Sequence, residues 1–195
     1  MIVSGRAPIF GLVIVMYGTL VACQMPDPAP GFADLSYAHH GAILLDVQRI
    51  KMVSTYVPSS KKPNVEHLSP VSPLATAEGW VRDRLRAVGK TGVAQATISR
   101  ASIIEVPLKR TKGIRGLFTK DQADRYDGLI EITIQILGVS GREKGSVLVR
   151  ASRSQTIAED VSRVDREKIW FEMTEAMMKD LNTTLQKQIN VTLGK

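Results

Sequence analysis

The sequence predicts an α+β domain: a single, mostly antiparallel, four-stranded sheet with two helices on one face. Isoleucines alternate with polar residues across Leu129–Leu137, which is typical of a strand with one buried and one wet face. Apolar residues recur at helical spacing in two other segments, after Ser72 and after Ser162. The expected order is β-α-β-β-β-α, and no internal repeat or second domain is visible.

The first expected strand is Ala42–Val53, which is rich in aliphatic and β-branched residues. Its apolar phase changes between Val47 and Ile50, as a bulge would require. The polar, proline-rich connection 54–73 then follows without periodicity. Connections of this length are uncommon in compact domains unless they have a function or lie along the surface.

The first helix is predicted to begin at Ser72 and Pro73, with serine as the N-cap and proline at the first helical position. Gly89 supplies the expected stop. Trp80 lies beside the apolar stripe and is expected to pack in the core. The stripe consists of Leu74, Ala77, Val81, Leu85 and Val88.

Three strands and a last helix complete the prediction. Gly92–Val106 is one strand, and Leu129–Leu137 forms a hairpin with Ser146–Ile157 across the turn sequence GVSGREKG. Ser162 and Asp165 resemble a capping box and predict a long final helix. Its core stripe consists of Trp170, Met173, Met177, Leu181 and Leu185.

The composition allows one domain of ordinary size in a chain of 195 residues. The formal charge is +7, from 26 basic and 19 acidic residues, which favours anionic partners. The ten aromatic residues offer few platforms for base stacking, so no nucleic-acid partner is expected. The single cysteine cannot form an intramolecular disulfide.

That cysteine closes an apolar N-terminal run, and this run has the layout of a signal peptide. Arg6 supplies the positive charge, and a mostly apolar stretch leads to Cys23. The 16 residues from Ala7 to Ala22 are broken by a proline and two glycines. A transmembrane helix needs about 20 apolar residues, so a membrane span is not expected.

The sequence Leu20-Val21-Ala22-Cys23 resembles the lipobox of bacterial lipoproteins, which lipoprotein signal peptidase recognises. The resemblance implies cleavage before Cys23, lipidation of its sulfur and acylation of the new N-terminus. Several acyl chains on one residue would hold the protein on a membrane, because each buried methylene contributes about 0.8 kcal/mol. Gln24 in place of Asp implies sorting to the outer membrane of a Gram-negative bacterium, on its periplasmic side. The expected organisation is a signal peptide (1–22), a lipidated, proline-rich tether (23–40) and one domain (41–195).

The order of elements behind a lipobox also resembles two groups of lipoproteins, at the level of topology alone. One group assists ABC transporters that move lipids across the periplasm, and the other assembles the lipopolysaccharide translocon. The resemblance implies an envelope protein as partner and transfers no site residue. It leaves the oligomeric state open.

Enzymatic motifs are absent from the sequence, so an enzyme, a cofactor and a metal site are not expected. The adjacent His39 and His40 would point apart in an extended tether, and His67 stands alone. Glu131 is expected on the wet face of its strand without an obvious partner.

The most suggestive stretch for a contact site runs from Pro107 to Gly128, where five cations fall within twelve residues. The candidate contact residues are Lys109, Arg110, Lys112, Arg115, Phe118 and Lys120. Cations mixed with apolar groups could bind an anionic amphiphile, a membrane surface or an acidic protein. A solvated loop with Phe118 folded back on the sheet is the other interpretation.

Two functions remain open at this stage. The first is a non-catalytic outer-membrane lipoprotein that assists the assembly or transport of envelope lipids through a partner complex. The second is a binding module for an anionic envelope polymer, lipopolysaccharide or peptidoglycan. In that case binding should be salt-sensitive and should weaken when Lys109, Arg110 and Arg115 are neutralised.

Overall fold

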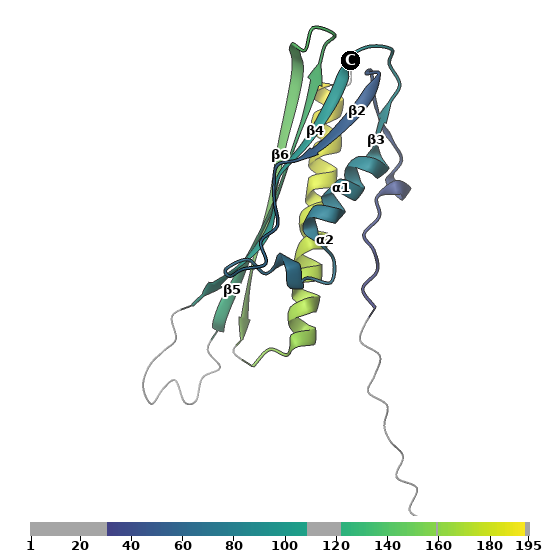
Figure 1. The fold of residues 1–195 in the computed structure, drawn as a ribbon. Helices are drawn as coiled ribbons and strands as arrows, with labels where there is room; N and C mark the ends of the chain where they lie inside the picture. The colour runs from purple at the N-terminus through teal and green to yellow at the C-terminus, as the bar shows by residue number, and fades with distance from the viewer. Residues whose placement is uncertain (1–30, 109–121, 159, 194–195) are drawn as a thin grey trace, which may run out of the picture.

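The computed structural model describes residues 31–108, 122–158 and 160–193 and confirms the α+β class (Figure 1). Two short 3-10 helices and two α-helices accompany six strands in the described part of the chain. In chain order the elements are η1 (Ala38–His40), β1 (Ile43–Leu45), β2 (Arg49–Ser54), η2 (Glu66–Leu68), α1 (Pro73–Arg84), β3 (Leu85–Ala87), β4 (Val93–Pro107), β5 (Gln122–Leu137), β6 (Glu143–Ala158) and α2 (Arg163–Thr192).

The main sheet has the strand order β2-β4-β5-β6. The pairs β4–β5 and β5–β6 are antiparallel, whereas β2 runs parallel to β4, so the sheet is mixed. Both α-helices lie on the same face of this sheet (Figure 1). The predicted hairpin is confirmed as β5 and β6, which are joined across the turn that follows Leu137.

The prediction of one strand over residues 42–53 is wrong, because this segment forms two strands in different sheets. β1 pairs with β3 in a separate two-stranded parallel sheet, while β2 joins the main sheet beside β4. Three residues separate β1 from β2, whereas five separate β3 from β4. The register of the β1–β3 pair therefore cannot continue into the β2–β4 pair. The predicted change of phase marks this junction, where Val47 is buried and its N–H binds the Leu45 carbonyl at 2.8 Å.

Helix α1 begins as predicted and ends earlier. The Ser72 hydroxyl accepts a hydrogen bond from the Ala75 N–H at 3.3 Å, which confirms the N-cap. Leu85 has an extended backbone and starts β3, because this segment pairs with β1. Gly89 lies beyond β3, and a Cβ there would stand 2.6 Å from the Val47 nitrogen. The glycine therefore permits close backbone approach and does not end the helix.

Strand β5 begins seven residues before its predicted start, because the polar segment after Gln122 pairs with both neighbouring strands. The buried face is as predicted, with Ile130, Ile132 and Ile134 fully enclosed. A Cβ on Gly128 would stand 2.7 Å from the Met177 methyl group, so this glycine gives α2 room to lie close to the sheet.

Helix α2 spans 30 residues and matches its predicted start. The Ser162 hydroxyl accepts from the Asp165 N–H at 3.1 Å and lies 2.6 Å from the Asp165 carboxylate. All five residues of the predicted stripe are buried. Within the described ranges, every helix is too short or too polar to span a membrane.

The buried side chains form two clusters along the sheet. The larger one lies under α1 and the C-terminal half of α2. The smaller one lies where β4 ends and where β5 and α2 begin, and it consists of Val65, Ile103, Tyr126, Ile157, Trp170 and Met173. Both clusters fall within residues 37–189, so a chain that begins at Gln24 contains all of this core.

The long connection 54–73 follows the edge of β4 beyond the end of β2. The Val65 N–H binds the Ile103 carbonyl and the Glu105 N–H binds the Pro63 carbonyl, both at 2.8 Å. Glu66 is 4% exposed, and its carboxylate accepts hydrogen bonds from four groups. They are the Tyr56 hydroxyl (2.6 Å), the Asn64 amide (3.0 Å), the Ser59 N–H (3.2 Å) and the Ile103 N–H (3.4 Å).

These hydrogen bonds also set the charge state of Glu66. Burial by itself would raise the pKa of this carboxyl, but the donors from Tyr56, Asn64 and Ser59 together outweigh it. The net result is a pKa below the ordinary value of 4.5. Glu66 is therefore a carboxylate at neutral pH and attaches the connection to the sheet.

Candidate functional site

One end of the molecule brings together three segments that are distant in sequence. β4 ends there at Pro107, β5 begins at Gln122, and the first turns of α2 lie beside them (Figure 1). The N-terminal strap, defined as residues 32–41, starts at the same end. Its Phe32 ring lies 5.1 Å from the ring of Phe171 in α2. The described chain therefore enters the domain at this end.

A cavity of about 260 Å³ opens between the long connection and α2 at this end. Its walls are mainly apolar, and Trp170 and Tyr126 are the large rings among them. Trp170 is 5% exposed, Tyr126 is fully buried, and their rings meet edge to face at 5.3 Å. The lining residues are Ser60, Lys62, Asn64, Val65, His67, Leu68, Glu105, Tyr126, Arg166 and Trp170.

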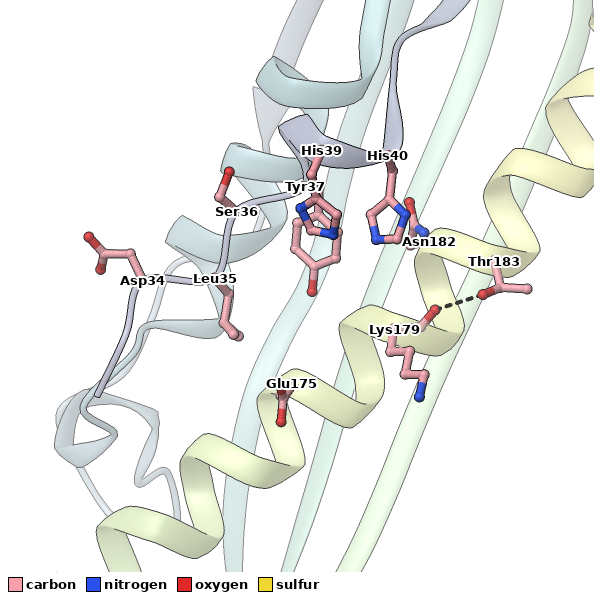
Figure 2. A pocket seen from close by; sticks show the side chains of 10 residues that line it. All are labelled: Asp34, Leu35, Ser36, Tyr37, His39, His40, Glu175, Lys179, Asn182 and Thr183. Carbon is pink, nitrogen blue, oxygen red and sulfur yellow. Dashed lines mark hydrogen bonds between the residues drawn. The ribbon is translucent and has the colours of Figure 1, made fainter. Parts of the chain in front are cut away.

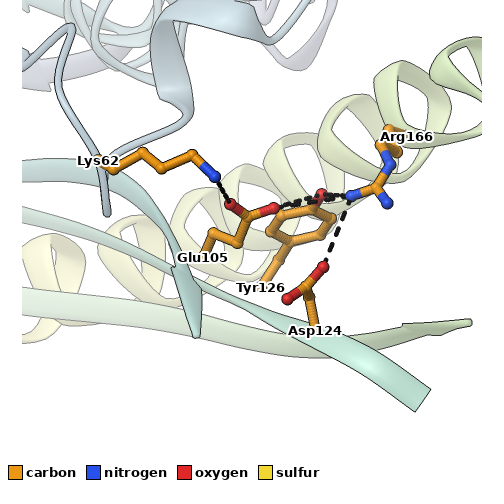
Figure 3. Close-up of polar contacts among 5 residues, drawn as sticks. All are labelled: Lys62, Glu105, Asp124, Tyr126 and Arg166. Carbon is orange, nitrogen blue, oxygen red and sulfur yellow. Dashed lines mark hydrogen bonds and ion pairs between the residues drawn. The ribbon is translucent and has the colours of Figure 1, made fainter. Parts of the chain in front are cut away.

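A network of five polar side chains lies along this cavity (Figure 3). The Tyr126 hydroxyl donates to Glu105 Oε1 at 3.3 Å and accepts from Arg166 Nη1 at 2.6 Å. Lys62 Nζ lies 3.1 Å from Glu105 Oε2. Arg166 Nη1 also lies 3.6 Å from Glu105 and 3.9 Å from Asp124. The network joins the connection, two strands and α2, and its four charged groups sum to zero.

The tyrosine in this network remains protonated at neutral pH. Burial raises the pKa of Tyr126, while the hydrogen bond and charge of Arg166 act in the opposite direction without cancelling the effect. Its hydroxyl can therefore donate to Glu105 while it accepts from Arg166.

Trp170, which lines this cavity, also carries a buried donor. Trp170 Nε1 is buried and has no hydrogen-bond partner among the residues that the structure describes. The contacts of the Arg166 guanidinium with described residues all pass through Nη1. A buried donor without a partner costs about 1–3 kcal/mol.

A second cavity, of about 350 Å³, lies between the strap and α2. Tyr37, His39 and His40 point from the strap toward Glu175 and Lys179 of the helix (Figure 2). Burial, together with the Glu175 charge, raises the pKa of Tyr37 to about 12. The residues around this cavity carry both signs of charge, and the strap itself forms one wall.

The floor of this second region is a buried polar cluster that holds the strap and both helices together. Asn182 Oδ1 accepts from Trp80 Nε1 at 2.9 Å and from Arg84 Nε at 3.1 Å. Arg84 also donates to Gln186 Oε1 at 2.6 Å and to the Gly41 carbonyl. Trp80 is fully buried, as predicted. The cluster has a structural role in joining α1, α2 and the strap.

The predicted lipidation and contact residues lie outside the described residues. These are Leu20, Val21, Ala22 and Cys23 at the N-terminus, and Lys109, Arg110, Lys112, Arg115, Phe118 and Lys120 between β4 and β5. Their roles therefore remain predictions. It places only the residues that flank the second group, Pro107 and Gln122, at the end of the molecule that carries the first cavity.

Two expectations about single residues are wrong. His39 and His40 do not point apart, because they lie in η1 with ring centres 4.1 Å from each other. No group of three or more potential metal ligands occurs within the described ranges. Glu131 has partners: it is 9% exposed and accepts from Ser99 Oγ and from Arg150 Nε, the latter at 2.7 Å. Ser99 reaches it because a bulge in β4 inserts this residue opposite Glu131.

Residues of the first cavity were missed by the sequence analysis. Tyr126 was part of a polar segment that looked like a loop, and Trp170 fitted the core stripe of α2. Glu105 and Arg166 stand far apart in the sequence and carry no motif. The sequence predicted only that Trp170, near the start of the last helix, is buried. Burial alone does not show whether the indole N–H has a partner.

No protein-family model matches the chain, and a search of curated proteins finds no match. Among solved structures, the uncharacterized lipoprotein B of Nitrosomonas europaea aligns at 14% identity and a TM-score of 0.40, covering 76% of this chain and 86% of that one. A minor lipoprotein of Acinetobacter baumannii aligns at 10% identity and a TM-score of 0.38, covering 75% of this chain and 93% of that one. The rare lipoprotein B of Shewanella oneidensis aligns at 8% identity and a TM-score of 0.33, covering 70% of this chain and 96% of that one. TM-scores of 0.40 and below are too low to establish a common fold.

Proposed function

We propose that the protein is a non-catalytic, lipid-anchored protein of the bacterial cell envelope. It assists the assembly or transport of outer-membrane lipid components through a larger envelope protein. The observation that carries the proposal is the sequence Leu20-Val21-Ala22-Cys23 directly after an apolar run. A diacylated and N-acylated Cys23 provides a permanent attachment, which a single acyl chain does not.

The geometry of the described domain supports an orientation in which the end that carries the first cavity faces the membrane. Gly31 is eight residues after Cys23, a distance that an extended chain spans in about 28 Å. The strap enters the domain beside Phe171, at the end where β4 stops and β5 starts. An anchor at Cys23 would therefore hold this end of the domain within about 28 Å of the membrane surface.

The non-catalytic assignment is supported by the state of the polar groups in the first cavity. Glu105 is held by Lys62, Tyr126 and Arg166, and the Tyr126 hydroxyl is held by two of the same groups. These groups stabilise one another and join the long connection, two strands and α2. A binding module for an anionic envelope polymer is the second candidate, and the excess of positive charge favours it.

The test of the anchor is mass spectrometry of the mature N-terminus after expression in a Gram-negative host. We expect an acylated Cys23 as the first residue of the wild-type protein, recovered in the outer-membrane fraction and cross-linked to a larger envelope protein. Cys23→Ser should abolish both the acylation and the membrane recovery. Cleavage at another residue, or an unmodified Cys23, would exclude the lipoprotein assignment. An acylated protein with no cross-linked partner, which binds lipopolysaccharide directly, would favour the second candidate.

A further inference from the structure

We propose that an apolar groove beside the start of the strap contacts the membrane that holds the anchor. This entry groove lies between Phe32 and Ala33 on one side and Val164, Lys168 and Phe171 of α2 on the other. Its occupant is the interface of a neutral phospholipid bilayer, into which the apolar side chains insert. The inference rests on the lipid anchor of the proposed function and adds the surface by which the domain meets the membrane.

The entry groove exposes apolar side chains to solvent. It has a volume of about 390 Å³, and the Phe32 and Phe171 ring centres lie 5.1 Å apart across it. Both rings are only partly buried, and Val164 is 47% exposed. Val164, Lys168 and Phe171 share one face of α2 because they follow each other at helical spacing. Exposed apolar patches of this kind mark contacts with other proteins or with membranes.

The distance of the groove from the anchor favours the membrane as its occupant. Gly31 lines the groove and stands eight residues after Cys23. An extended chain of this length spans about 28 Å, so an anchored Cys23 holds the groove at or below this distance from the bilayer. A short tether of this kind gives an effective concentration in the millimolar range. A weak apolar affinity is therefore enough for the groove to dock.

The charges beside the groove indicate a neutral interface. Arg163 Nε lies 2.9 Å from the Glu167 carboxylate, so this cation is compensated within the helix. Lys168 Nζ lies 3.8 Å from the Glu172 carboxylate. Glu175, which also lines the groove, adds a negative charge. Docking should thus depend on apolar contact and should be insensitive to salt, unlike the binding of an anionic polymer.

The experiment supplies the anchor chemically. Cys23 is the only cysteine of the protein, so a chain that begins there can be coupled through its thiol to a maleimide lipid in phosphatidylcholine vesicles. Val164→Trp places a fluorescent reporter at the groove. Val139→Trp is the matched control, because Val139 is 83% exposed and lies in the β5–β6 turn. The 16 residues of β5 span about 50 Å, so this turn lies at the opposite end of the sheet (Figure 1).

We expect lipids that are brominated on their acyl chains to quench the emission of Val164→Trp. The emission of Val139→Trp should stay unchanged in the same vesicles. The two native tryptophans are common to both variants, so the unsubstituted chain gives their background. Sodium chloride at 0.5 M should leave the quenching in place, because at about this concentration interactions between exposed charges are largely screened.

Removal of the rings tests which side chains hold the groove on the membrane. Phe32→Ser together with Phe171→Ser should lower the ratio of docked to undocked Val164→Trp protein by at least about tenfold, because both rings leave the interface. Phe32→Ser alone should lower it less and tests the same point if the double variant does not fold. Val57→Ser, at a site that is 82% exposed in the long connection, should have no effect. Circular dichroism without vesicles shows whether each variant is folded.

Three results would overturn the proposal. They are equal quenching of the two reporters, no quenching of either, and a docked fraction that does not change when the rings are removed. A blue-shifted Val164→Trp emission without quenching would also overturn it, and sedimentation would then show whether a second copy of the chain fills the groove. Because the coupling replaces acylation by the cell, its failure would leave the result for Cys23 intact. An unmodified Cys23 in cells would likewise leave the quenching interpretable.

Discussion

Replacement of Glu66 by glutamine tests whether one carboxylate attaches the long connection to the sheet. In the native structure Oε1 accepts from Tyr56, Ser59 and Asn64, while Oε2 accepts from Asn64 and from the Ile103 N–H. Glutamine has one oxygen and one NH₂ group in place of these two oxygens. Glu66→Gln therefore brings an NH₂ group against donors in either orientation of the side chain.

The cost can be estimated from the orientation that retains the most hydrogen bonds. With the amide oxygen at the Oε1 position, the NH₂ group faces the Ile103 N–H, which is left without an acceptor. An unsatisfied buried donor costs about 1–3 kcal/mol. The remaining bonds also lose their charge assistance, and such bonds are roughly twice as strong as neutral ones. We expect a total loss of about 2–4 kcal/mol, with the slope of the denaturation curve unchanged.

The assay is urea unfolding followed by circular dichroism, with the chain that begins at Gln24. Glu78→Gln is the matched control, because Glu78 lies on α1 and is only partly buried. Its stability should stay within about 0.5 kcal/mol of the wild type. If Glu66→Gln were equally mild, the carboxylate would not be the group that holds the connection, and the argument from its hydrogen bonds would be refuted.

Two further predictions concern acid and the core. Acid should destabilise the protein, because the pKa values of Glu66, Asp127 and Glu131 are all lowered in the folded state. Their contribution is present above the ordinary values of 3.8 and 4.5 and is lost as the pH falls through the lowered values. Urea unfolding below pH 4.5 should show this loss of stability. In Glu66→Gln the free energy of unfolding should depend less steeply on pH. Parallel profiles of the variant and the wild type would contradict the prediction. Leu181→Ala should lower the free energy of unfolding by about 2–5 kcal/mol, because Leu181 is fully buried. Leu148→Ala, at a half-exposed site, should lower it by less than about 0.5 kcal/mol. Similar values for both variants would contradict the assigned core.

The elements that could be predicted are those whose pattern depends on one buried face. The isoleucines of β5 and the stripe of α2 each face a single core, so their periodicity is visible in the local sequence. The start of β5 was not visible, because its first seven residues are mostly polar and are held by pairing with β4 and β6. The end of α1 likewise depends on the pairing of Leu85 with Ile43.

The candidate site could not be predicted because topology alone assembles it. Lys62 belongs to a connection without periodicity, Glu105 to the end of a strand, and Arg166 to the first turn of a helix. No spacing rule relates these positions. Charge complementarity became evident only when the three elements were placed side by side. The partners of Glu131 were hidden for the same reason, since Ser99 faces it only through a bulge.

The two parallel pairs, β1–β3 and β2–β4, also have a consequence for the order of folding. Ile43 pairs with Leu85 and Arg49 with Val93, across a crossover that contains the long connection and α1. The β5–β6 hairpin closes over a short turn, and loop-closure entropy grows with the length of chain enclosed. We expect the hairpin to be structured in the folding transition state and both parallel pairs to form late, with φ-values near zero for substitutions in β1 and β3. High φ-values there would contradict this order. The segment nearest the proposed anchor would therefore be the last part of the domain to become native.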